Sequence, residues 1–171
     1  MIFKDQSFGE KMKVSEITYK HILYTTEFSE TWQEVFSHAL GIAKQYKAKL
    51  TFLYVLNTEL IDLLTFDVGL ERLPSIDKKF TEAKDFTTNT RKKIVKKITG
   101  AFGKECIKDI DILVERGNPV KIILNVAEEK ECDLIVMGFK GETALEDHTI
   151  GSTVNRVLHR SKLPVLVIHN I

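Results

Sequence analysis

The sequence predicts an α/β protein in which a parallel β-sheet is covered by helices on both faces. Short runs of apolar and β-branched residues alternate along the chain with segments whose apolar residues recur every three or four positions. Such alternation is typical of parallel sheets joined by right-handed helical crossovers. Sheets of this kind bind ligands at the carboxyl ends of their strands, where the strand order reverses.

The first strand, helix and second strand are expected before residue 57. The β-forming run HILYTT occupies 21–26, and apolar residues then recur at helical spacing from Ser29, the expected N-cap, to Tyr46. The run KLTFLYVL at 49–56 has almost no polar residue, which indicates a strand covered on both faces.

The middle of the chain is less regular. Residues 57–77 indicate a short helix and a loop, and 78–102 a helix closed by Gly100 and Gly103. The basic run RKKIVKK at 91–97 lies in this helix, and we interpret it as a solvated face rather than a nucleic-acid patch.

The last third of the chain repeats the strand–helix pattern. Gly117 turns the chain, Asn118 is the expected N-cap of the next helix, and Pro119 takes its first position. The remaining expected elements are strands at 109–115, 133–138 and 163–169 and a short helix at 152–160.

Length and charge limit the class of protein. The 171 residues suit a single domain at 19–171 after an N-terminal extension at 1–18. The 25 basic and 24 acidic residues indicate neither a nucleic-acid nor a membrane partner. Cys106 and Cys132 have no metal-ligand spacing, so we expect reduced thiols in a cytoplasmic protein.

A glycine-containing loop follows the strand at 133–138. Gly138 and Gly141 allow a positive φ and a close backbone approach to a ligand. Gly151-Ser152 then opens the short helix, whose N-terminal N–H groups form an anion site. The string is neither a Rossmann fingerprint nor a P-loop. The alternative is that the glycines have only a structural role in a strand–loop–helix connection.

The complete spacing, Gly138-x2-Gly141-x9-Gly151-Ser152, resembles the nucleotide-binding signature of the universal stress protein family. HILYTTEFSE, AKLTFLYVLN and GNPVKIILNVAEEKECDLIVMG are similar to other parts of that family, so the resemblance covers 19–171 apart from 57–90. It implies a three-layer α/β/α sandwich with a five-stranded parallel sheet, Rossmann-like and similar to the adenine nucleotide alpha-hydrolases. It also implies a homodimer.

The resemblance further implies that ATP or AMP binds at the carboxyl ends of the first and fourth strands. Thr26 and Glu27 would face the base and ribose, Val55 the adenine, and Met137 the ribose. The residues that this resemblance assigns to the nucleotide site are Thr26, Glu27, Val55, Met137, Gly138, Gly141, Gly151, Ser152, Thr153 and Val154.

The sequence departs from the family pattern at two acidic positions. Glu27 replaces the usual aspartate, and Glu142 stands where a basic residue is common. Glu146 and Asp147 add negative charge beside Lys140, although both carboxylates could simply face water. Like charges ~4 Å apart cost on the order of 4 kcal/mol at an effective dielectric near 20, so Mg²⁺ bridging the phosphates would relieve the repulsion.

No catalytic residue is assigned. The loop has no arginine, and His148 is expected to be solvated, so we expect a nucleotide-binding regulatory protein in the stress response rather than an enzyme. The alternatives are a ligand-free dimeric scaffold and, below it, a slow ATPase. The apolar strand at 163–169 would pair with a second copy, unless the N-terminal arm covers its edge.

Overall fold

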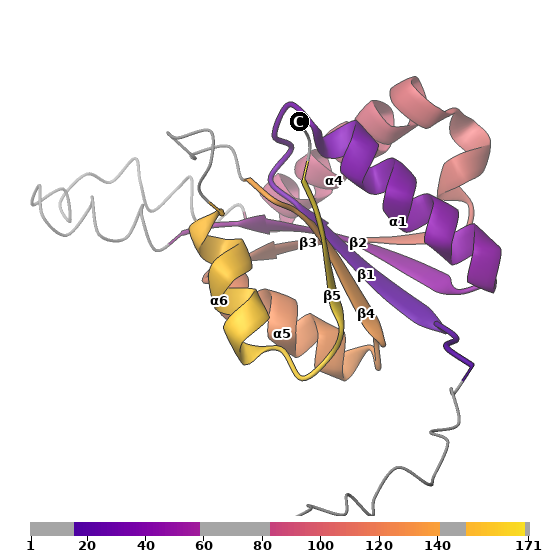
Figure 1. Cartoon of the computed structure of the whole chain (residues 1–171). Coiled ribbons are helices and arrows are strands. Elements are labelled where there is room, and N and C mark those ends of the chain that lie inside the picture. The colour runs from indigo at the N-terminus through magenta and orange to yellow at the C-terminus, as the bar shows by residue number, and fades with distance from the viewer. Residues whose placement is uncertain (1–15, 59–82, 141–149, 170–171) are drawn as a thin grey trace, which may run out of the picture.

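The computed structural model describes residues 16–58, 83–140 and 150–169, with the side chains of 83–86 excepted (Figure 1). Several expectations lie outside this part of the chain. They are most of the N-terminal extension, most of the segment 57–77, the start of the helix at 78–102, and residues Gly141, Glu142, Glu146, Asp147 and His148.

The sheet has five parallel strands, as predicted, and their order is β3-β2-β1-β4-β5. From β1 the chain moves outward to β2 and β3, and then returns to place β4 on the other side of β1. The strand order therefore reverses between β1 and β4, which is where a sheet of this type opens a crevice. The strands are β1 (His21–Thr26), β2 (Lys49–Leu56), β3 (Ile110–Arg116), β4 (Leu134–Gly138) and β5 (Val165–Ile168).

Helices cover both faces of the sheet and complete the expected three-layer sandwich (Figure 1). Helices α1 and α4 pack on one face, and α5 and α6 pack on the other. A short 3-10 helix, η2, which the sequence did not indicate, follows α4. The bounds are α1 (Trp32–Tyr46), α4 (Ala83–Phe102), η2 (Lys104–Ile107), α5 (Pro119–Glu129) and α6 (Ser152–Arg160).

The two halves of the core differ in chemistry. Side chains alternate along a strand, so Tyr24 of β1 faces α1 whereas Leu23 faces α5. On the α1 side, Tyr24 contacts Phe36 and Phe52, with ring centroids 5.2 and 5.1 Å apart. The other side is aliphatic. A rigid aromatic layer thus lies directly beneath the turn that leaves β1.

The predicted helix ends are confirmed for α5, confirmed for only one of two glycines in α4, and wrong for α1. The side chain of Asn118 accepts the Lys121 N–H at 3.0 Å and caps α5 as predicted. Gly103, at φ 83°, ends α4, whereas Gly100 lies inside it. The expected Ser29 cap is wrong: α1 starts at Trp32, whose N–H bonds to the Ser29 carbonyl in a preceding turn.

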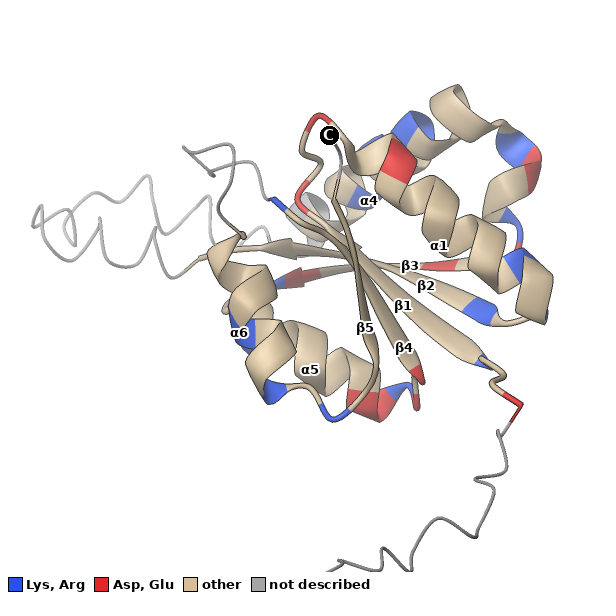
Figure 2. Ribbon diagram, in the orientation of Figure 1, with Lys and Arg blue, Asp and Glu red and all other residues tan. Residues whose placement is uncertain are grey.

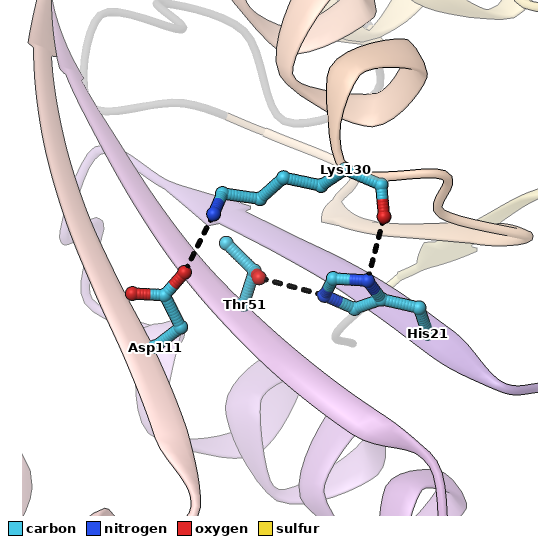
Figure 3. Close-up of polar contacts among 4 residues, drawn as sticks. All are labelled: His21, Thr51, Asp111 and Lys130. Carbon is cyan, nitrogen blue, oxygen red and sulfur yellow. Dashed lines mark hydrogen bonds and ion pairs between the residues drawn. The ribbon is translucent and has the colours of Figure 1, made fainter.

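A polar network ties the amino ends of the strands together (Figure 3). The imidazole of His21 bonds to the Lys130 carbonyl through Nδ1 at 2.8 Å and to the Thr51 hydroxyl through Nε2 at 2.9 Å. Lys130 also pairs with Asp111 at 2.8 Å, and Asp133 accepts the His21 N–H at 3.2 Å. The end of the sheet opposite the crevice is therefore fastened by side chains from four segments.

The charged residues lie mainly on the helices and at the ends of the strands (Figure 2). The basic residues of the run 91–97 are all exposed on α4, as a solvated face requires. Within the described ranges, no helix is long and apolar enough to cross a membrane.

Candidate functional site

A pocket of about 220 Å³ opens at the carboxyl ends of β1, β2 and β4. It lies at the reversal of strand order, between the ends of β1 and β4 and the N-termini of α5 and α6. Its size is slightly below the ~300–1,000 Å³ of typical small-molecule sites. The topology alone therefore creates a concave site at the position expected for this class of sheet.

The inner wall of the pocket is apolar. Val55 lies near the end of β2, Met137 near the end of β4, and Val154 in the first turn of α6; each is at most 6% exposed. Pro119 and Ile123 of α5 also line the pocket. These side chains give this part of the lining an apolar surface.

The end of β1, the following turn and the start of α1 contribute Thr26, Glu27, Ser29 and Trp32 to the lining. This part of the lining therefore contains a carboxylate, two hydroxyls and an indole. Carboxylates and hydroxyls at this position can accept hydrogen bonds from a polyol such as a ribose.

The N-terminus of α6 supplies the opposite charge. Its first intrahelical bond runs from the Asn155 N–H to the Gly151 carbonyl at 2.9 Å. The N–H groups of Ser152, Thr153 and Val154 therefore have no partner inside the helix and carry the positive end of its dipole. Lys140, also in the lining, adds a cation. This end of the pocket is therefore electropositive, as an anion site requires.

Gly138 does not use the positive φ that glycine allows. Among the described residues, the glycines with positive φ are Gly103 and Gly117. A Cβ added to Gly138 would lie 3.4 Å from a Val35 methyl and 3.6 Å from the Lys140 carbonyl oxygen, both ordinary contacts. The fold therefore does not require glycine at 138, and the missing side chain leaves space beside the pocket.

The pocket brings together nine of the ten residues that the sequence assigned to one site; Gly141, the tenth, lies outside the described residues. Sequence reasoning did not assign the other lining residues, because Trp32, Val35 and Ile123 belong to apolar stripes that indicate core packing. The lining residues missed in this way are Tyr24, Thr25, Ser29, Trp32, Val35, Pro119, Ile123, Lys140 and Ile150.

Tyr24 of the pocket lining remains in its neutral form. Burial raises the pKa of Tyr24 well above its usual range, so its hydroxyl stays protonated and donates to the Trp32 carbonyl at 3.1 Å. In the part of the chain that the structure describes, no three His, Cys, Asp or Glu side chains form a metal-binding group.

The fold and this pocket define an α/β protein with a ligand crevice of the Rossmann-like type. The model of the universal stress protein family matches residues 18–169. The chain belongs to the universal stress protein family.

Individual relatives agree with this assignment. Universal stress protein MJ0531 of Methanocaldococcus jannaschii is 35% identical, over 90% of this chain and 84% of its own length. The structure of MJ0577, from the same organism, superposes with a TM-score of 0.71 at 26% identity and covers 91% of this chain and 99% of its own.

A universal stress protein solved in complex with cAMP superposes with a TM-score of 0.57 at 21% identity, over 90% of this chain and 98% of its own. At this level of identity the likeness supports the fold alone. The cyclic nucleotide is a ligand of that protein.

Proposed function

We propose that this protein binds an adenine nucleotide, ATP or AMP, in the pocket between β1 and β4, and that the nucleotide acts as a regulatory ligand in a stress response. The observation that carries the proposal is the lining of the pocket, which combines apolar side chains, the Glu27 carboxylate and the N-terminus of α6. A base, a ribose and phosphates would use these three environments.

Each part of the nucleotide has a proposed partner. The adenine would lie against Val55, the ribose would contact Glu27 and pass over Met137 and Gly138, and the phosphates would reach α6. Mg²⁺ would enter with a triphosphate and bridge its oxygens. A universal stress protein of the same fold was solved with cAMP, which is itself an adenine nucleotide.

A ligand-free scaffold is the second candidate. It is favoured by Glu27, which is one methylene longer than aspartate and projects a negative charge into a pocket that must accept phosphates. Slow ATP hydrolysis ranks below both, because the described lining holds no arginine and no group placed as a base.

A homodimer through β5 is proposed with either function. This strand lies at the edge of the sheet, and its four residues are only partly buried. Pairing with a second copy would satisfy the open edge and give a two-fold dimer. We further propose a cytoplasmic location, as the reduced cysteines indicated.

Calorimetry with ATP and AMP, with and without Mg²⁺, tests the nucleotide proposal. Binding near one nucleotide per chain supports the switch, and the absence of heat with every ligand supports the scaffold. Phosphate release during the same incubations reports on the slow ATPase.

A further inference from the structure

Phe28 has an unusual backbone conformation beside the pocket. Its φ is 62°, in the left-handed region that bulky side chains rarely enter. Its neighbours Glu27 and Ser29 both line the pocket. Strained residues persist only where their surroundings hold them, and they are concentrated at ligand sites. The residues around Phe28 must therefore hold its backbone in this conformation.

The ring of Phe28 is clamped on the aromatic side of the core. Its centroid lies 5.1 Å from the Trp32 ring, 5.8 Å from Phe52 and 5.6 Å from Tyr54. We call these three rings around Phe28 the clamp. Because Trp32 also lines the pocket, the clamp is in direct contact with the pocket wall. The Phe28 N–H donates to the Thr26 hydroxyl at 2.9 Å and closes the turn from within.

Helix α4 completes the clamp. The ammonium group of Lys97, an exposed residue of α4, lies over the Phe28 ring, 4.4 Å from its centre. A cation over an aromatic face is attracted by the ring quadrupole. Phe28 thus connects α4, α1 and β2 to a four-residue turn that forms one wall of the pocket.

We propose that Phe28 is a positioning residue for the nucleotide site: its clamped ring holds residues 26–29 in the geometry that presents Thr26 and Glu27 to the ligand. The inference rests on the proposed function, because residues 26–29, which Phe28 positions, form the wall that is proposed to contact the ribose. Phe28 itself is absent from the lining and acts through its neighbours. Lys97 strengthens the clamp from outside.

Three variants of Phe28 distinguish the effect of its aromatic contacts from the effect of its left-handed backbone. Phe28→Leu removes the aromatic contacts, and Phe28→Asn removes them while suiting the left-handed backbone. Phe28→Tyr keeps the ring. Phe102→Leu is the matched control, because Phe102 packs on Trp32 and Phe36 in the same layer but is not part of the lining.

We expect Phe28→Leu and Phe28→Asn to weaken ATP binding at least tenfold in calorimetry. Phe28→Tyr should stay within threefold of the wild type, and Lys97→Met should lose two- to fivefold. Phe102→Leu should lower the melting temperature and leave the affinity within twofold. The proposal is overturned if Phe28→Leu binds as tightly as the wild type, or if Phe102→Leu weakens binding equally.

A measurement on the ligand-free protein tests the positioning role of Phe28 independently of the proposed nucleotide binding. Hydrogen exchange follows the amides of 27–30 directly, whereas the emission of Trp32 responds to both Phe28 and Phe102, whose rings both contact it. Phe28→Leu should speed exchange at 27–30 at least tenfold, whereas Phe102→Leu should leave this exchange unchanged. If the wild type binds no ATP, the proposed function fails, and these ligand-free data alone decide whether Phe28 positions the turn: unchanged exchange would refute it.

Discussion

The backbone N–H of Gly151 donates to the carbonyl oxygen of Phe139 at 2.9 Å. This bond joins the end of β4 to the start of α6 across the connection between them. The Phe139 N–H in turn bonds to the Ile168 carbonyl at 2.8 Å, which anchors the same point to β5. The two parts of the glycine motif, which are separated in the sequence, therefore meet at the carboxyl ends of the strands.

Gly138→Ala should weaken ATP binding at least tenfold while the melting temperature stays within about 2 °C of the wild type. The protein has room for the methyl group, which would contact Val35 at an ordinary 3.4 Å. Both Val35 and Lys140 line the pocket, so the methyl would occupy space that the proposed ligand needs. Calorimetry and thermal unfolding measure the two effects; equal affinity would place the nucleotide elsewhere.

Gly151→Val should abolish ATP binding without unfolding the protein. Gly151 has φ −57° and ψ 140°, an extended conformation that valine also adopts. The branched side chain would block the approach of phosphates to the α6 N–H groups. Gly41→Val is the control, because Gly41 is exposed on α1 with nothing within 4 Å of an added Cβ. Undiminished binding by Gly151→Val would reject the phosphate site.

His21→Ala should lower the free energy of unfolding by about 1–3 kcal/mol, since it leaves the fully buried Thr51 hydroxyl without its partner. Thr51→Val removes the other half of the pair. In the double variant both groups are apolar, so part of the loss should be recovered. Urea unfolding of the four proteins gives the coupling; strictly additive losses would contradict a specific His21–Thr51 bond.

Stability should fall between about pH 9 and pH 11 because of Cys132. Burial raises the pKa of its thiol from 9.0 to about 11 in the folded protein. A raised pKa means that the folded state keeps the proton longer, so its stabilising effect is complete below pH 9 and is lost as pH rises through 11. In Cys132→Ala the decline over this range should be smaller by about 2 kcal/mol. Identical pH profiles would show that the thiol does not titrate in this way.

Val167→Pro should give a monomer if β5 forms the dimer. The carbonyls of Pro164 and Ile168 accept bonds from β4, so by alternation the N–H of Val167 points to the open edge. Proline removes that donor and leaves the β4 pairing intact. Val167→Ala keeps the N–H and should remain dimeric in light scattering. A Val167→Pro dimer with native circular dichroism would exclude pairing through this edge.

The sequence was sufficient for the fold because its periodicities are strong. The helix start at Asn118-Pro119 and the apolar runs of the strands could be predicted without any tertiary information. Its failures have a common physical origin. Trp32 was indistinguishable from a core residue, since one side chain can both fill the core and line a pocket. The left-handed backbone of Phe28 is imposed by its tertiary contacts, and nothing in the local residue pattern encodes it.

The most direct test of the central claim is to denature the purified protein, chromatograph the released small molecules, and titrate the ligand-free protein with ATP and Mg²⁺. The account predicts released adenine nucleotide, or saturable binding of ATP, near one per chain. Neither released nucleotide nor titration heat would mean that the glycine motif is structural only, and that the protein acts as a scaffold.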